Sequence, residues 1–417
     1  MTNIKLQFVI CHLMITICCF TYQAWGQENQ IHDPFELTDG DRVVLLGNAL
    51  MENDLKNGYI EYALTTRWPD RDITFRNLGW SGDTVFGEAR GYYTTPPDAY
   101  GHLILQLEEA APTVVFVAYG AVEAFEGEAG IPRFEEGLLQ LIDKIGELGA
   151  KPVLLSPIPQ FPVILSIEET ARRNEILQQY GRSIEKVAGK YGLRYLDLFR
   201  PMQKIGRRTP ITINGVHLNE LGYFYLAGLI ERKLDLPPRE WVLSIDGSSD
   251  EVENSGLSLS ELSVDSDGLE FKIAADLLPL PMPDQSGGLS GYGYKVKITN
   301  LPDGIYAMSA EGGRQVGASA GAWAKGVVMG NGAAFRQAAV LRDLIINKNE
   351  FFFHQYRPQN RTYLTGFRSH EQGHNVTELK QLDEFISRYE NLIKNHRIPE
   401  PQVYRLQRLD EEEARND

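Results

Sequence analysis

Val43-Val-Leu-Leu-Gly-Asn-Ala-Leu-Met-Glu52 is the stretch that decides the fold. Four consecutive apolar residues lead into a glycine turn and then into residues that favour a helix. Such an apolar run indicates a strand buried on both faces, as in the interior of a parallel sheet. The turn after the strand then opens at the carboxyl edge, where α/β proteins bind ligands. Here the turn carries Gly47, Asn48 and Ala49, none of which offers a hydroxyl, thiol or carboxylate.

Strand and helix patterns alternate from this stretch to about residue 235. Apolar or alternating runs predict further strands at 72–78, 113–119, 152–156 and 194–198, and amphipathic spacing predicts helices at 53–67, 134–148, 166–192 and 219–234. Ser166 and Glu169 form a capping-box pattern at one helix start. This order predicts an α/β fold with a doubly wound parallel five-stranded sheet of the flavodoxin-like type.

The periodicity changes after Leu236-Pro-Pro238. Clean alternation at 269–273 and 294–298 predicts a small antiparallel β module over 238–328, and the Pro-, Gly- and Ser-rich stretch 279–293 reads as a mobile loop. Helical spacing returns at 335–353 and 382–393. We therefore expect an α/β domain over 27–237, the β module, and C-terminal helices with a tail over 329–417 that pack on the main domain. The acidic end after residue 409 has a composition typical of disorder.

Residues 1–26 have the pattern of a secretory signal peptide. Lys5 precedes a largely apolar run at 6–20, and Ala24-Trp-Gly26 is a small-x-small cleavage pattern. This predicts a secreted or periplasmic protein with no membrane span after cleavage. All three cysteines lie in this segment, so the mature chain has no thiol nucleophile and no Cys-ligated metal. Cys18 and Cys19 leave a lipid anchor open as an alternative.

The net charge of −15 over 417 residues disfavours non-specific binding to nucleic acid, and it disfavours binding to anionic lipid. The acidic charge suits a protein that acts on neutral or cationic ligands, and we expect no cofactor.

Three further stretches follow predicted strands or precede the last helix of the α/β domain. They are Asn77-Leu-Gly-Trp-Ser-Gly-Asp-Thr84, Tyr119-Gly-Ala-Val-Glu123 and Asn214-Gly-Val-His217. A parallel sheet would bring all three to the edge that carries Gly47. Glycine amides can face an oxyanion, and a histidine can be oriented by a hydrogen-bonding side chain three residues earlier.

In this order the four stretches resemble the SGNH (GDSL-type) hydrolase family, over about residues 36–235. The resemblance implies a serine nucleophile, a glycine and an asparagine in the oxyanion hole, a histidine base, and an aspartate that orients it. Gly82 falls on the oxyanion glycine and His217 on the base. The other three positions are replaced: Ala49 falls on the serine, Val122 on the asparagine and Asn214 on the aspartate.

These replacements remove support for an acyl-enzyme route, because a methyl group cannot attack an ester and valine donates no hydrogen bond. The sequence predicts a secreted esterase-like hydrolase, ancestrally acting on acyl or O-acetyl-glycan esters, whose activity is weak or lost. The alternative is a non-catalytic protein that binds a glycan or acyl ester in the same pocket. In a third interpretation the β module and the tail carry the function, and the α/β domain is a scaffold.

Several side chains near the expected site have two interpretations. Ser81 could replace the nucleophile or hold a turn, and Asn48 could contact a ligand or accept the turn. Glu123 could be a general acid or base, or a salt-bridged carboxylate at a helix start. Trp80 and Tyr119 could stack on a sugar ring, or could cover the core.

A dense polar run follows the helix predicted at 335–353, and its members are His354, Arg357, Asn360, Arg368, His370, Glu371 and His374. It could form a cap over the ligand or a hydrogen-bonded clasp that docks the tail. His370, Glu371 and His374 give only a weak metal-binding pattern, and we expect no metal.

Overall fold

The structure is a computed structural model that describes residues 34–91, 98–249, 251–265, 268–283, 291–310, 315–359, 368–372 and 376–409. The predicted signal peptide and the acidic end after residue 409 lie outside these ranges. The described residues from 36 to 409 form one compact unit.

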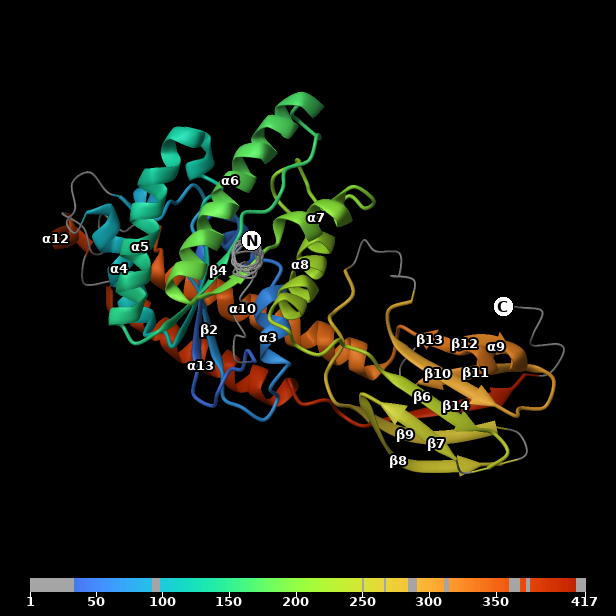
Figure 1. The fold of residues 1–417 in the computed structure, drawn as a ribbon. Coiled ribbons are helices and arrows are strands. Elements are labelled where there is room, and N and C mark those ends of the chain that lie inside the picture. Colours follow the sequence, from blue (N-terminus) through green and yellow to red (C-terminus); the bar gives the residue numbers. More distant parts are fainter. Residues whose placement is uncertain are drawn as a thin grey trace, which may run out of the picture. The chain divides into compact units, whose positions relative to one another are not determined.

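Within the described residues, five parallel strands form the first sheet, in the order β2-β1-β3-β4-β5. Figure 1 labels β2 and β4 of this sheet. Their bounds are β1 Arg42–Gly47, β2 Thr74–Asn77, β3 Val114–Ala118, β4 Lys151–Leu155 and β5 Arg194–Leu196. This confirms the α/β fold class. β1 lies between β2 and β3, so the chain reverses its winding direction beside β1. In doubly wound sheets such a switch point is where ligands bind.

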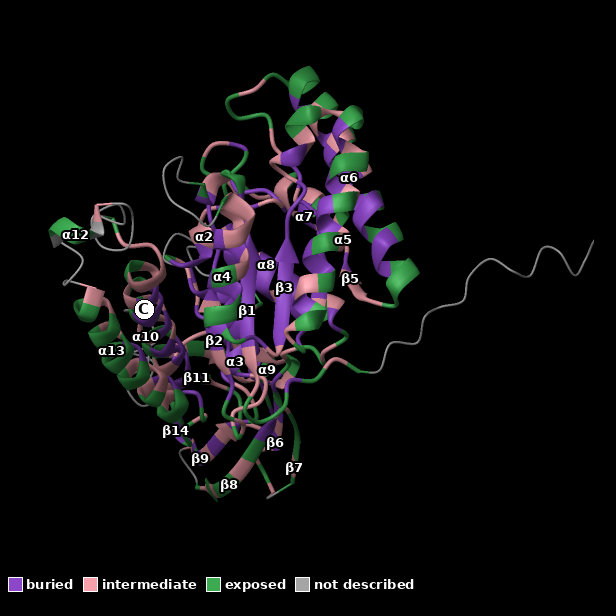
Figure 2. Ribbon diagram, turned by 90° about the vertical axis from the view of Figure 1, so that its left-hand side faces the viewer, coloured by how far each residue is buried: buried purple, intermediate pink, exposed green. Residues whose placement is uncertain are grey.

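Helices cover both faces of this sheet, and their bounds are α2 Ala49–Asp54, α3 Tyr59–Thr65, α4 Ala99–Ala110, α5 Ile131–Glu147, α6 Ile167–Tyr191, α7 Phe199–Gly206 and α8 Glu220–Lys233. Val44 and Leu46 of β1 share a core cluster with residues of α4, α5 and α6. Val43 and Leu45 point the other way and are equally buried, on the face where α3 packs against α8. Figure 2 shows β1 and β3 buried along their length.

The predicted helix at 53–67 is wrong: the segment forms two helices, α2 and α3. Both oxygens of the buried Asp54 accept hydrogen bonds from the next helix, from Tyr59 N at 3.1 Å and Ile60 N at 3.2 Å. Gly58 takes a left-handed φ of +66°, which a continuous helix does not allow. By contrast, the capping box at the start of α6 is confirmed by Glu169 N to Ser166 Oγ at 3.2 Å and Ser166 N to Glu169 Oε2 at 3.1 Å.

Two further sheets follow the α/β domain. Their elements are β6 Val242–Asp246, β7 Val252–Ser255, β8 Leu257–Val264, β9 Gly268–Ala275, β10 Tyr294–Thr299, β11 Ile305–Ala310, β12 Val316–Ser319, α9 Ala320–Lys325 and β13 Val327–Met329. The sheet orders are β13-β10-β6-β7, in which β10 and β6 run parallel, and β12-β11-β14-β9-β8, which is antiparallel.

The expected mobile loop at 279–293 is wrong for its first part. Pro279 and Pro281 are buried, and their carbonyls accept from Tyr62 Oη at 2.7 Å and Tyr59 Oη at 3.0 Å. Residues 284–290 lie outside the described ranges. The segment therefore joins the β sheets to α3 of the α/β domain.

The C-terminal elements are α10 Ala333–Tyr356, α12 Ser369–Gln372, α13 Val376–His396 and β14 Gln402–Arg408. α10 packs on α13, α3 and β2, and its buried Lys348 pairs with Glu61 of α3 at 2.6 Å. The sequence analysis missed β14, which lies between β9 and β11. The tail thus completes a sheet that began more than a hundred residues earlier.

Candidate active site of a hydrolase-type pocket

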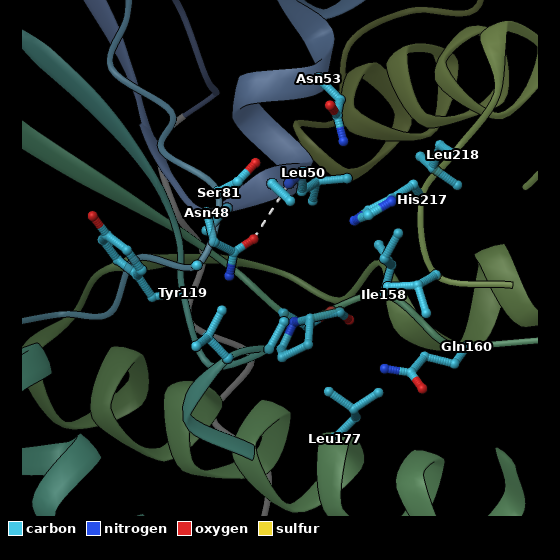
Figure 3. Close-up of a pocket in the computed structure, with 18 of the residues that line it drawn as sticks. Asn48, Leu50, Asn53, Ser81, Tyr119, Ile158, Gln160, Leu177, His217 and Leu218 are labelled. Carbon is cyan, nitrogen blue, oxygen red and sulfur yellow. Dashed lines mark hydrogen bonds between the residues drawn. The ribbon is translucent and has the colours of Figure 1, made fainter. Parts of the chain in front are cut away.

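The loops after β1, β2 and β3 and the loop before α8 meet around a cavity of about 290 Å³ (Figure 3). Six of the predicted site residues line it: Asn48, Ala49, Ser81, Gly82, Tyr119 and His217. Val122, which the sequence resemblance aligns with an oxyanion asparagine, lines it too. Trp80, Glu123 and Asn214 do not. The structure therefore brings the four predicted stretches together.

The loop after β2 is fitted against α2. A side chain on Gly79 would place its Cβ 2.1 Å from Glu52 N, so only glycine allows this approach. Gly82 has φ +79° and faces open space, which leaves its backbone accessible from the cavity.

A buried ion pair holds the same loop from below. Asp83 and Arg90 are fully buried and pair at 2.7 Å, and Arg90 also donates to Leu78 O at 2.8 Å. Tyr119 Oη donates to Asp83 at 2.9 Å, and burial raises the pKa of Tyr119 well above its usual value. The Tyr119 hydroxyl is therefore occupied and does not serve a ligand. Asp83 was visible in the Ser-Gly-Asp-Thr motif, but nothing in the sequence indicated its partner Arg90.

Trp80 is a core residue and not a sugar platform. The residue is 4% exposed. The Cζ atom of Arg357 lies 3.9 Å from the centre of its ring, and the Cζ atom of Arg90 lies 5.1 Å from it. Arg357 also pairs with Glu52 at 3.1 Å. Within the polar run, Arg357 thus links the end of α10 to α2 and to the loop after β2, as the clasp interpretation expects.

The other members of the polar run fall into two groups. Arg368 pairs with Glu371 at 2.6 Å within its own short helix, whereas Asn360 and His374 lie outside the described residues. Among those described, His354, Arg368, His370 and Glu371 do not line the cavity.

Glu123 connects two loops. Its oxygens accept from Val85 N at 2.9 Å and Gly120 N at 2.8 Å, and the residue is 4% exposed. Burial raises the pKa of this carboxyl to about 7. The predicted salt bridge at a helix start is wrong, because the carboxylate binds backbone amides instead.

The environment of His217 fixes its tautomer. Asn214 Oδ1 accepts from the backbone N–H groups of Val216 at 3.1 Å and His217 at 2.8 Å. Its oxygen is therefore engaged, and the amide nitrogen Nδ2 faces His217 Nδ1 at 3.2 Å. An amide nitrogen only donates, so Nδ1 accepts, and the hydrogen of the neutral ring is on Nε2. Figure 3 shows the ring pointing into the cavity.

This tautomer is the reverse of the one a general base requires. An orienting carboxylate accepts from Nδ1–H and leaves the Nε2 lone pair free to take a proton. In this chain Nε2–H is a donor, so His217 presents a hydrogen bond to the cavity rather than a base.

Asn48 contributes a buried donor that has no partner in the described part of the chain. Its Oδ1 accepts from Leu50 N at 3.3 Å and caps α2, while Nδ2 has no hydrogen-bond partner among the described residues. The residue is 4% exposed, and Figure 3 shows the amide nitrogen directed into the cavity. Leaving such a group unsatisfied costs about 1–3 kcal/mol, which a bound acceptor would recover.

The family model for the GDSL-like lipase/acylhydrolase family matches residues 37–224. The match covers somewhat less than half of the chain, and this part of the chain is similar to that family. The match contains all four site loops, from Asn48 to His217. A search of curated proteins found no match.

Among solved structures, the chain is similar to a gut microbial diltiazem-metabolizing enzyme, with a TM-score of 0.70 and 16% identity over 90% of this chain and 99% of that one. This likeness shows a shared fold that includes the β sheets and C-terminal elements as well as the α/β domain. The chain is also similar, over 49% of its length and 98% of the other chain, to an acetylxylan esterase from Geobacillus stearothermophilus, at 17% identity and a TM-score of 0.38. A further similar structure is an alpha/beta hydrolase enzyme from the metagenome of Lake Arreo, at 17% identity and a TM-score of 0.38, over 48% of this chain and 97% of that one.

Over the described ranges, no three His, Cys, Asp or Glu side chains converge as a metal site would require. In the same part of the chain, no helix has both the length and the apolar character needed to cross a bilayer.

Proposed function

We propose that this chain is a secreted member of the GDSL-like family that binds an acyl ester in the hydrolase pocket and forms no acyl-enzyme. Secretion rests on the leader pattern at 1–26. The binding role rests on a pocket that keeps the family's loops and histidine while the groups needed for attack are replaced.

The observation that carries the proposal is the tautomer of His217. A serine nucleophile needs a base with a free lone pair on the nitrogen that faces it. The Asn214 amide at 3.2 Å from Nδ1 places the hydrogen on the other nitrogen, Nε2. In triad hydrolases, an amide in place of the orienting carboxylate costs about 10⁴-fold in rate through this effect.

Two further replacements support the same conclusion. Ala49 puts a methyl group on the cavity wall where the resemblance expects the nucleophile, and Val122 puts an apolar side chain where it expects an oxyanion donor. Losing one such donor costs about 10²- to 10³-fold. Ser81 also lines the cavity, but no hydrogen bond joins it to His217 among the described residues.

Hydrolysis by an activated water is the rival function. It needs a base in the cavity, and Glu123 was the candidate beside His217. Both Glu123 oxygens accept backbone hydrogen bonds at 2.8–2.9 Å, and the residue does not line the cavity. The rival therefore has weaker support than binding.

The test compares wild-type protein with His217→Ala on 4-nitrophenyl acetate and on acetylated xylan. We expect both proteins to release nitrophenol at the same background rate and neither to release acetate from xylan. A wild-type rate well above background that disappears in the variant would establish catalysis and refute the proposal. Titration of the purified protein with an uncleaved acyl ester gives the second readout, and saturable binding is expected.

A further inference from the structure

The described residues that line the cavity include no carboxylate, ammonium or guanidinium group. A charged ligand would therefore leave water without gaining an ionic partner, which is costly. The lining favours a neutral ligand, and it disfavours the carboxylate that an esterase would release as product.

Asn48 and His217 direct donors into the cavity, and the lining also contains Gln160, whose buried Oε1 has no hydrogen-bond partner among the described residues. Asn48 Nδ2 is buried and has no partner among the described residues. Its orientation is fixed, because exchanging its oxygen and nitrogen would put an NH₂ group against Leu50 N–H, which now donates to Oδ1 at 3.3 Å.

The second donor is His217 Nε2–H, whose hydrogen is placed there by Asn214. Figure 3 shows the Asn48 amide and the His217 ring directed into the same cavity, from the β1 loop and from the loop before α8. Two donors facing one space suit an acceptor such as a carbonyl oxygen, which has two lone pairs.

Most of the remaining wall is apolar, although Asn53, Ser81, Ser156 and Gln160 also line the cavity. Val122, Phe125, Ile158 and Leu177 form this apolar part. Trp80 does not line the cavity, and the Tyr119 hydroxyl is bonded to Asp83. Aliphatic walls of this kind bind acyl or aryl groups better than hydroxyl-rich rings, because a sugar would lose hydrogen bonds to water without replacement.

We propose that the ligand is a neutral, apolar carbonyl compound. Its carbonyl oxygen accepts from Asn48 Nδ2 and His217 Nε2–H, and its acyl or aryl group lies against Val122, Phe125, Ile158 and Leu177. This inference rests on the proposed function, since it uses the same pocket. The inference goes beyond the proposed function in one respect. The site selects for a carbonyl acceptor and not for a cleavable bond, so amides bind as well as esters.

The test is calorimetric titration with compounds that share one apolar group and differ in the head group. The set is methyl hydrocinnamate, hydrocinnamamide, hydrocinnamate at pH 8 and propylbenzene, with an acetylated xylo-oligosaccharide as the glycan. We expect the ester and the amide to bind within about threefold of each other, and the other three compounds to bind at least about tenfold more weakly.

The variant that isolates the donor is Asn48→Asp. It keeps the oxygen that caps α2 and replaces the donor by an acceptor, so the fold is retained and affinity for ester and amide falls by about tenfold or more. The matched control is Asn347→Ala on the exposed surface of α10. The Asn347 amide donates to Asp343 O at 2.8 Å in its own helix. This variant should bind as wild type does. Circular dichroism checks that each variant is folded.

The outcomes separate the two proposals. Hydrolysis of the ester, or no binding by any compound of the set, refutes the proposed function. Ester binding that is unchanged in Asn48→Asp, or hydrocinnamate or the glycan binding as tightly as the ester, refutes only the present inference.

Discussion

Replacing Asn214 by aspartate in an Ala49→Ser background tests how the imidazole is held. One aspartate oxygen can keep the two backbone hydrogen bonds that Asn214 Oδ1 accepts at 2.8 and 3.1 Å. The other oxygen then faces His217 Nδ1, where Nδ2 now lies at 3.2 Å. Because a carboxylate only accepts, the hydrogen moves to Nδ1 and Nε2 becomes a base toward the new serine.

The expected gain follows from the cost of the reverse change. An amide at the orienting position lowers the rate of triad hydrolases by about 10⁴-fold, so Ala49→Ser/Asn214→Asp should hydrolyse 4-nitrophenyl acetate about 10³- to 10⁴-fold faster than Ala49→Ser alone. Val122 still supplies no oxyanion donor, so the absolute rate stays low. The assay is a stopped-flow burst of nitrophenol, which counts acyl-enzyme formed per site.

Asn214→Asp alone is the matched control, and it should remain inactive because residue 49 is still alanine. If Ala49→Ser alone were as fast as the double variant, the tautomer argument would be refuted. If the double variant formed no acyl-enzyme while remaining folded, the geometry of the site would differ from the one described.

Three other predictions concern stability. Arg90→Met leaves the fully buried Asp83 without its ionic partner, so the free energy of unfolding should fall by about 3–5 kcal/mol in urea titrations, and an unchanged value would contradict the role given to this pair. Burial raises the pKa of Glu123 from 4.5 to about 7, so the stability that this carboxyl contributes is complete below pH 4.5 and is lost as the pH rises toward 7. Over that window the free energy of unfolding of wild type should fall by up to about 3 kcal/mol relative to that of Glu123→Gln. Equal pH dependence of the two unfolding free energies would contradict this. A chain ending at Pro401 lacks β14 and leaves β9 and β11 unpaired on one side, so circular dichroism should show lost strand content and a lower Tm, whereas an unchanged melt would refute a structural role for the tail.

Sequence patterns predicted the parts of the fold that depend on local periodicity. Apolar and alternating runs located all five strands of the parallel sheet, and the Ser166–Glu169 capping box located the start of α6. The break between α2 and α3 was missed, although Asn57-Gly58 is a turn pattern, because the deciding contacts come from the buried Asp54. β14 was missed because its partners, β9 and β11, are distant in the chain.

The candidate site divides in the same way. The block order identified which loops converge, and six of the residues expected there line the cavity. The sequence could not assign Trp80 to the core, because that depends on Arg357 from α10. Nor could it give the direction of the Asn214 amide, which is set by two backbone N–H groups of a turn. The exchange of a carboxylate oxygen for an amide nitrogen thus changes which ring nitrogen of His217 carries the hydrogen.

The most direct test of this account is long-range proton–nitrogen NMR of the imidazole of His217 in ¹⁵N-labelled wild-type protein, assigned by its absence in His217→Ala. At a pH where the ring is neutral, we predict that Nδ1 has the shift of an unprotonated, pyridine-like nitrogen and Nε2 that of a protonated, pyrrole-like one. The opposite assignment, with the hydrogen on Nδ1, would mean that the ring can act as a base and would contradict the central claim.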